Sequence, residues 1–186
     1  MTAPRSGFVV WLTGLSCSGK STLGRLVAAE LDRRGHLVDS LDGDAVRRHL
    51  SAGLGFSRED RDTNVERVAW VASRLARAGA AVVVTLISPY EAARHSARAT
   101  VEEHSPFVEV HVATPLAVCI SRDDRGLYAK ALAGELANFT GVNDPYEEPA
   151  DPELRVDTDG ESPEASARRI LARLEELGLV SEERAA

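Results

Sequence analysis

The residues from Gly14 to Ser21 form the pattern G-x-x-x-x-G-K-S, which places two glycines, a lysine and a hydroxyl at fixed spacing. A loop of this pattern surrounds phosphates with backbone N–H groups, because its glycines let the main chain curl close to an anion. Lys20 is expected to reach the β- and γ-phosphates of a nucleoside triphosphate, and Ser21 to ligate Mg²⁺. The pattern therefore predicts a binding site for ATP and Mg²⁺.

The sequence on each side of this loop has the form that the mechanism requires. Phe8–Thr13 is a short apolar run typical of a strand, and a helical pattern follows from Lys20 to about Arg34 before Gly35. The N-terminus of that helix directs the positive end of its dipole at the phosphates. A Gly/Ser-rich turn with an incidental lysine would need neither the strand before it nor the helix after it. We expect the nucleotide to contact Gly14, Ser16, Cys17, Ser18, Gly19, Lys20, Ser21 and Thr22.

Further apolar runs and helical patterns alternate along the chain. Leu37–Leu41 predicts a second strand, with the acidic residues of Asp42-Gly43-Asp44 at its carboxyl end and a short helix after it. Ser57 and Asp60 resemble a capping box that opens a long helix ending before Gly79. The other predicted strands are Ala80–Ile87, Phe107–Val112 and Leu154–Thr158, and the other predicted helices are Tyr90–Glu103, one capped by Thr114-Pro115, and one from Ser162-Pro163 to Leu177.

Residues 122–152 interrupt this alternation with charged, Gly-containing stretches and three prolines. Such a segment is typical of a mobile excursion over a site, and we interpret it as a lid. Strands alternating with helices predict an α/β fold, namely a parallel sheet flanked by helices in three layers, as in P-loop nucleoside-triphosphate hydrolases. The length of 186 residues favours a single domain, 1–186, with ligands beyond the carboxyl ends of the strands.

Composition excludes several classes of function. A net charge of -7 argues against a general surface for nucleic acid or anionic membranes. No apolar run is long enough to span a membrane, and Met1–Gly7 has no apolar signal core after Arg5, so we expect a cytoplasmic protein. Cys17 and Cys119 are expected to be free thiols. Only two of the 22 basic Lys and Arg residues are lysines, which indicates that Lys20 is needed as a compact ammonium.

A series of further motifs occurs in fixed order along the chain. They are Leu41-Asp42-Gly43-Asp44-Ala45-Val46-Arg47, Leu54-Gly55-Phe56-Ser57 with Asp60-Arg61, Ile87-Ser88-Pro89-Tyr90, Arg122-Asp123 with Gly126-Leu127-Tyr128, and Asn138-Phe139-Thr140-Gly141. From about Gly7 to Leu177 the chain resembles adenylylsulfate kinase (APS kinase). The resemblance implies transfer of the γ-phosphate of ATP to the 3'-hydroxyl of adenosine 5'-phosphosulfate, which gives ADP and 3'-phosphoadenosine 5'-phosphosulfate. It also implies a homodimer.

The resemblance assigns a role to individual residues. Asp44 matches the carboxylate that orients the attacking hydroxyl, and with Ser21 it is expected at the metal. Ser88 matches a serine beside the transferring phosphate, so that Lys20, Asp44 and Ser88 form the implied catalytic set. Arg122 and Thr158 are implied at the nucleotide. The implied acceptor-binding residues are Asp44, Arg47, Phe56, Arg61, Asn64, Ile87, Ser88, Lys130 of the lid and Phe139, with Phe56 and Phe139 stacking on adenine.

The same residue types suit the chemistry apart from any family. Phosphoryl transfer needs positioning and neutralised charge, a carboxylate can align a hydroxyl, and aromatic faces stack on a purine. Each residue also has an ordinary structural interpretation. Asp44 can cap the next helix, the arginines can be solvated surface charges, and Phe56 and Phe139 can belong to a satellite core. The five histidines show no metal or catalytic spacing and are expected to be structural.

The chain departs from the family pattern at several places. Glu91 stands where a basic residue is usual, Ala93 and Ala129 lack expected charges, Leu132 replaces an arginine, and Ala45 replaces an asparagine. Three hypotheses therefore remain open. They are an APS kinase, a related kinase for another modified nucleotide such as a cytidine diphosphoramidate, and a catalytically silent nucleotide-binding protein. A GTPase is disfavoured, because no N-K-x-D segment is present to read guanine.

Overall fold

The structure is a computed structural model that describes residues 7–181. The expectation about Met1–Gly7 concerns residues that, except for Gly7, lie outside this range. The strands are β1 (Phe8–Thr13), β2 (Val38–Asp42), β3 (Ala81–Thr85), β4 (Phe107–Val112) and β5 (Leu154–Val156). The helices are α1 (Lys20–Arg33), α2 (Gly43–His49), α3 (Arg58–Arg77), α4 (Glu91–Glu102), α5 (Leu116–Ser121), α6 (Leu127–Leu132) and α7 (Pro163–Glu176).

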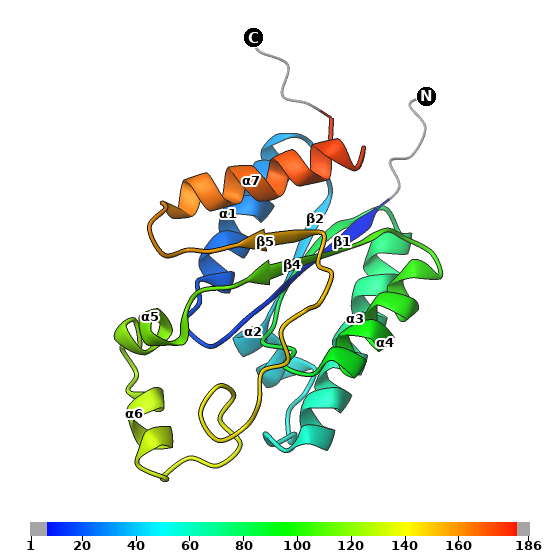
Figure 1. Cartoon of the computed structure of the whole chain (residues 1–186). Helices are drawn as coiled ribbons and strands as arrows, with labels where there is room; N and C mark the ends of the chain where they lie inside the picture. Colours follow the sequence, from blue (N-terminus) through cyan, green and yellow to red (C-terminus); the bar gives the residue numbers. More distant parts are fainter. Residues whose placement is uncertain (1–6, 182–186) are drawn as a thin grey trace.

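The five strands form one parallel sheet in the order β2-β3-β1-β4-β5. Figure 1 shows α1 and α7 on one face of this sheet and α3 and α4 on the other, with α5, α6 and the loop after them beyond one end of the strands. Helices cover both faces because parallel strands need crossover connections. The predicted three-layer α/β fold is thereby confirmed.

The central strand β1 divides the core between the two faces of the sheet. Phe8, Val10 and Leu12 pack with α1 and α7, whereas Val9 and Trp11 pack with α3 and α4. Side chains alternate along a strand, so a strand covered on both faces is apolar throughout. All six residues of β1 are buried, which fixes the loop that follows it.

Several predicted element boundaries were wrong. The strand predicted over Ala80–Ile87 ends at Thr85, because the chain turns sharply afterwards and Ser88 has a φ of 44°. Thr114 was predicted to cap a helix, but Pro115 is the cap residue of α5 and makes no side-chain cap hydrogen bond. The Thr114 hydroxyl donates instead to the Ser18 carbonyl at 2.8 Å, so it holds the phosphate loop.

The predicted start of the long helix is confirmed, with a local difference. The Ser57 hydroxyl accepts from the backbone N–H of Asp60 at 3.1 Å, as a cap should. The Asp60 carboxylate does not complete the box but accepts from the N–H of Gly55 at 3.0 Å. It thereby fixes the turn before α3 that carries Phe56.

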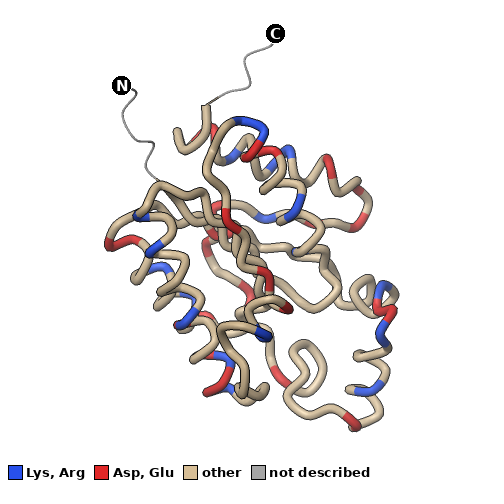
Figure 2. The backbone as a smooth tube through the Cα atoms, turned by 180° about the vertical axis from the view of Figure 1, so that it is seen from behind, with Lys and Arg blue, Asp and Glu red and all other residues tan. Residues whose placement is uncertain are grey.

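Within residues 7–181 no helix is both long and apolar enough to cross a membrane. Figure 2 shows acidic and basic residues interspersed along the helices. Many of them pair along one helix, as Arg98 does with Glu102 in α4 at 3.1 Å. Such exposed pairs add little stability each.

Candidate functional site

The loop from Gly14 to Gly19 joins β1 to α1 at the carboxyl edge of the sheet. Gly14 has a φ of 152°, and a Cβ there would lie 2.5 Å from the carbonyl oxygen of Val112. Gly19 has a φ of 101° and directly precedes α1. Glycine suits the positive φ at both positions, and at Gly14 there is also no room for a Cβ. Main-chain N–H groups of a loop with this curl can bind an anion.

Lys20 is the first residue of α1 and is buried. Its Nζ donates to the carbonyl of Leu15 at 2.5 Å and to the Ser18 hydroxyl at 3.4 Å, so it lies across the mouth of the loop. Burial lowers the pKa of Lys20 to about 8. An anionic ligand would raise this pKa, because a nearby negative charge stabilises the ammonium.

Asp42, at the end of β2, receives hydrogen bonds from the first turn of α1 and from the end of β3. Its Oδ2 accepts from the Ser21 hydroxyl at 2.7 Å and from the Thr85 hydroxyl at 2.8 Å. Burial alone would raise the pKa of Asp42, but these two bonds and the charge of Lys20 bring it below its ordinary value. A carboxylate that stays ionised beside a serine hydroxyl provides oxygen ligands of the kind that Mg²⁺ prefers.

Two cavities open on either side of the loop. The first, of about 500 Å³, combines the loop and the start of α1 with Arg122 and Thr158. Arg122 donates from Nη1 to the Thr158 hydroxyl at 2.7 Å and from Nη2 to its carbonyl at 2.9 Å, which joins the end of α5 to the loop after β5. Arg122 and Thr158, which were predicted to contact the nucleotide in addition to the loop, therefore lie next to each other. The cavity is lined by Cys17, Gly19, Lys20, Ser21, Thr22, Leu23, Arg122, Thr158, Glu161 and Pro163.

The second cavity, of about 560 Å³, lies between the carboxyl ends of β2 and β3, the α2–α3 region and the start of the lid. Its lining includes most of the predicted acceptor residues, namely Asp44, Arg47, Phe56, Arg61, Asn64, Ile87 and Ser88. Cys17, Lys20 and Ser21 line both cavities. A phosphoryl group bound at Lys20 would therefore face both spaces.

Two arginines surround the exposed ring of Phe56. The guanidinium carbon of Arg47 lies 4.6 Å from the ring centroid, and that of Arg61 lies 5.5 Å from it. Arg47 also donates to the carbonyl of Gly55 at 2.6 Å, and Arg61 donates to the carbonyl of Asn138 in the lid at 2.6 Å. This arrangement provides an aromatic face beside positive charge, which suits a purine with an anionic tail.

Asp44 projects into the mouth of the second cavity from the first turn of α2. Its Oδ2 lies 3.3 Å from Nη2 of Arg125, and both side chains are largely exposed. The N-cap of α2 is Asp42, so the alternative that Asp44 itself caps the helix is wrong. Arg125 was missed in the sequence, although its position between Arg122-Asp123 and Gly126 pointed to the lid.

Tyr128 attaches the lid to the phosphate loop. Its side chain is buried, and its hydroxyl donates to the carbonyl of Ser16 at 3.0 Å. Its ring meets that of Phe139 edge-on, with centroids 4.9 Å apart. Tyr128 therefore contacts both the loop and the segment that carries Phe139, a role that no sequence pattern indicated.

Two predicted acceptor residues do not reach either cavity wall. Lys130 lies exposed on α6, and Phe139 is half-buried, with its ring edge-on to that of Tyr128. Their roles remain predictions. Asp42, Thr85 and Arg125 line the second cavity without having been predicted.

The family model and the curated relatives indicate the same family. The family model described as adenylylsulphate kinase matches residues 6–157. The chain is 52% identical over 176 residues to an adenylyl-sulfate kinase of Chloroflexus aurantiacus, covering 95% of this chain and 93% of that protein. It is also 55% identical over 175 residues to a probable bifunctional SAT/APS kinase 2 of Sorangium cellulosum, where the match covers 94% of this chain but spans only 30% of that protein.

Solved structures agree with the sequence comparison. An APS kinase of Mycobacterium tuberculosis, solved in complex with AMPPNP and APS, superposes with a TM-score of 0.89 at 44% identity, covering 92% of this chain and 99% of that chain. A gluconokinase from Sinorhizobium meliloti, at 20% identity and a TM-score of 0.61, shares the fold alone. With the phosphate loop, the two cavities and the matched family model, the chain belongs to the adenylylsulfate kinase family.

Proposed function

We propose that this protein transfers the γ-phosphoryl group of ATP to the 3'-hydroxyl of adenosine 5'-phosphosulfate. The observation that carries the proposal is that Cys17, Lys20 and Ser21 line both cavities, so that one phosphate position is shared by two ligand spaces. Such a junction suits direct transfer between two bound nucleotides. The Chloroflexus relative is an adenylyl-sulfate kinase, and the Mycobacterium structure is an APS kinase in complex with AMPPNP and APS, which supports this choice of reaction.

In this reaction the oxygen of the ribose 3'-hydroxyl attacks the γ-phosphorus, and the bond from that phosphorus to the β–γ bridging oxygen breaks to release ADP. Lys20 and the loop N–H groups hold the phosphates and offset their charge. Asp44, at the mouth of the second cavity, orients the hydroxyl and accepts its proton as the new bond forms. Arg125 lies beside that carboxylate, with Nη2 3.3 Å from Oδ2 of Asp44.

The residues at the loop fit the Mg²⁺ that accompanies ATP. The Ser21 hydroxyl and the Asp42 carboxylate lie 2.7 Å apart, directly beside Lys20 in the loop. In residues 7–181 no cluster of three or more His, Cys, Asp or Glu side chains could hold a metal by itself. This agrees with a cation held by one or two protein oxygens and the phosphates, which is the usual mode for Mg²⁺. When bound, the ion neutralises charge on the β- and γ-phosphates.

The acceptor is proposed as the phosphosulfate because the residues that depart from the family pattern, Ala45 included, are not among those that line the second cavity within residues 7–181. Glu91, Ala93, Ala129 and Leu132 are absent from its lining in the described part of the chain. Arg47, Arg61 and Arg125 do line it and supply cationic groups for an anionic tail. A changed acceptor would be expected to change these residues first.

The test measures ADP release by the purified protein with Mg-ATP and a panel of adenosine and cytidine nucleotides. The panel includes the phosphosulfate and a cytidine diphosphoramidate. Turnover restricted to the phosphosulfate is the expected result. Turnover of another member only would support the related kinase, and binding of ATP without any turnover would support the silent protein. Lys20→Ala is the control, and it should abolish transfer while leaving the thermal unfolding curve in place.

Two further expectations accompany this proposal. We propose a homodimer, to be tested by light scattering. One solved relative, from Thiobacillus denitrificans, is described as a hexameric APS kinase, although the match spans only 30% of that chain. We also propose a cytoplasmic location, which is the expectation from the sequence.

A further inference from the structure

Ser88 is held in an uncommon conformation at the wall of the second cavity. It has a φ of 44°, in the left-handed region that residues other than glycine rarely adopt, and it is 3% exposed. Its carbonyl accepts from Nη1 of the buried Arg94 at 2.8 Å. Arg94 in turn pairs through Nε with Glu109 of β4 at 2.9 Å. Such backbone strain persists only where the surroundings enforce it, and it occurs often at functional sites.

The hydroxyl of Ser88 is fixed from behind by Trp11. Trp11 is fully buried in β1, and its Nε1 donates to Oγ of Ser88 at 3.0 Å. An indole N–H can only donate, so the Ser88 oxygen must accept this bond, and its own proton must point elsewhere. Within residues 7–181 no hydrogen bond has the Ser88 hydroxyl as its donor. One buried hydroxyl proton is therefore left beside a cavity.

We propose that Trp11 is a positioning residue that makes the Ser88 hydroxyl a donor to an anionic oxygen of the acceptor. Trp11 lies too deep to contact a ligand itself, and it acts by occupying one lone pair of the Ser88 oxygen. Ser88 shares the cavity wall with Arg47, Arg61 and Arg125, so the ligand group in reach is expected to be anionic. The identity of the acceptor as a phosphosulfate nucleotide rests on the proposed function, whereas the Trp11–Ser88 bond does not.

Steady-state kinetics with ATP and adenosine 5'-phosphosulfate test the proposal. Trp11→Phe keeps an aromatic ring against Phe107, whose centroid lies 5.7 Å away, but removes the N–H. Trp11→Phe and Ser88→Ala should each lower kcat/KM for the acceptor about tenfold, as expected for a hydrogen bond to a charged group, and should leave KM for ATP unchanged. The double variant should be no worse than Ser88→Ala, because both changes remove the same bond. Additive losses, or a Trp11→Phe enzyme with wild-type kcat/KM, would overturn the proposal.

Trp70 provides the matched control, because the chain has two tryptophans and this one is 58% exposed on α3. Trp70→Phe should leave both substrates' constants unchanged. If Trp11→Phe fails to fold, the tryptophan analogue benzothienylalanine can be used instead, because it carries sulfur in place of the N–H at nearly the same size. In the Trp70→Phe chain this analogue enters at position 11 alone. The same predictions apply to that protein.

The indole N–H signals in a ¹⁵N–¹H correlation spectrum give a readout that needs no turnover. The Trp11 signal should exchange slowly with solvent and should move in Ser88→Ala, while the Trp70 signal should stay in place. A Trp11 signal that does not respond to Ser88→Ala would contradict the inference directly. A wild-type enzyme that fails to use the phosphosulfate would overturn the proposed function instead, and the spectrum would still decide on the bond.

Discussion

The hydroxyl of Ser21 donates to Oδ2 of Asp42 across 2.7 Å, and so connects the start of α1 to the end of β2. The same oxygen of Asp42 accepts from Thr85 of β3 at 2.8 Å. Parallel strands bring their carboxyl ends to one edge, which is why residues far apart in the chain meet at the phosphate loop. This contact places a second carboxylate, Asp42, beside Ser21, whereas the predicted place of Asp44 at the metal stays a prediction.

Asp42→Asn should lower kcat by about 10- to 100-fold and raise the Mg²⁺ concentration needed for half-maximal rate, because the amide lacks the charge that orients the Ser21 hydroxyl and a cation. The measurement is the rate of ADP formation over a Mg²⁺ titration. Asp39→Asn is the matched control on the same strand, since Asp39 is exposed and within residues 7–181 its side chain accepts a hydrogen bond only from the backbone N–H of Ser40. Equal effects of the two changes would exclude a specific role for Asp42.

Nucleotide binding should take up a proton at a pH near 8. Burial lowers the pKa of Lys20 to about 8 in the free protein, and bound phosphates raise it because they favour the ammonium. ATP affinity should therefore fall as the pH rises through this value. Calorimetry in two buffers of different ionisation enthalpy counts the protons, and Lys20→Met should remove the uptake. Uptake that persists in Lys20→Met would assign the proton to another group.

Tyr128→Phe should raise KM for ATP roughly fivefold, because the loss of one hydrogen bond of about 1 kcal/mol loosens the phosphate loop. The ring remains to pack on Phe139, so the fold of the lid should persist. Tyr90→Phe is the comparison, since the Tyr90 hydroxyl bonds Asp144 at 2.9 Å rather than the phosphate loop. It should leave KM for ATP unchanged. An unaltered KM for ATP in Tyr128→Phe would show that the loop holds its shape without the lid.

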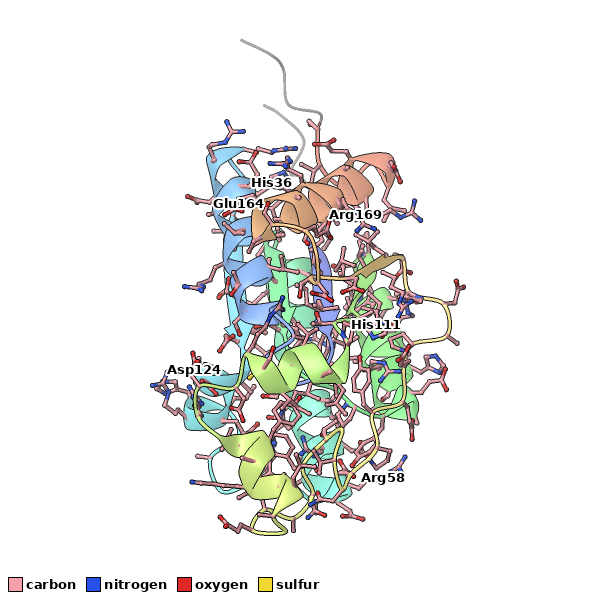
Figure 3. All side chains as sticks on the ribbon, turned by 60° about the vertical axis from the view of Figure 1, so that its left-hand side comes forward. His36, Arg58, His111, Asp124, Glu164 and Arg169 are labelled. Carbon is pink, nitrogen blue, oxygen red and sulfur yellow. The ribbon has the colours of Figure 1, made fainter. Side chains whose placement is uncertain are left out.

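The protein should lose stability as the pH falls from about 6.5 through about 4, because burial lowers the pKa of His111 from 6.5 to about 4. The unfolded chain then binds the proton more readily than the folded one over this interval, so acid favours unfolding by up to about 3 kcal/mol. Figure 3 labels His111, and its ring lies 5.8 Å from that of Tyr146.

Urea denaturation at pH values on both sides of this interval measures the effect. His111→Asn cannot take up the proton and should show a shallower pH dependence of unfolding free energy than the wild type. His104→Asn is the control, because the His104 side chain is partly exposed. The explanation would be wrong if both variants kept the full acid sensitivity of the wild type.

The sequence by itself determined the position of the phosphate loop and the order of strands and helices except for α6, which lies in the segment predicted as an irregular lid. Buried parallel strands are continuous apolar runs, as in Phe8–Thr13, and a phosphate loop needs glycines at fixed spacing, so both features are local. The cap at Ser57 and the stop at Gly35 are local as well. These are the features for which neighbouring residues carry enough information.

Only the tertiary structure decided which distant groups share the site. The local sequence predicts Thr114 as a helix cap, but its hydroxyl donates to the Ser18 carbonyl. It predicts Trp11 only as a core residue, but its indole N–H also donates to the hydroxyl of Ser88. The meeting of Asp42 with Ser21 and of Tyr128 with Ser16 depends on how sheet and lid pack, which no short-range pattern encodes. The physical reason is that hydrogen bonds between side chains from different elements exist only after burial of both faces of the sheet has fixed the relative positions of those elements.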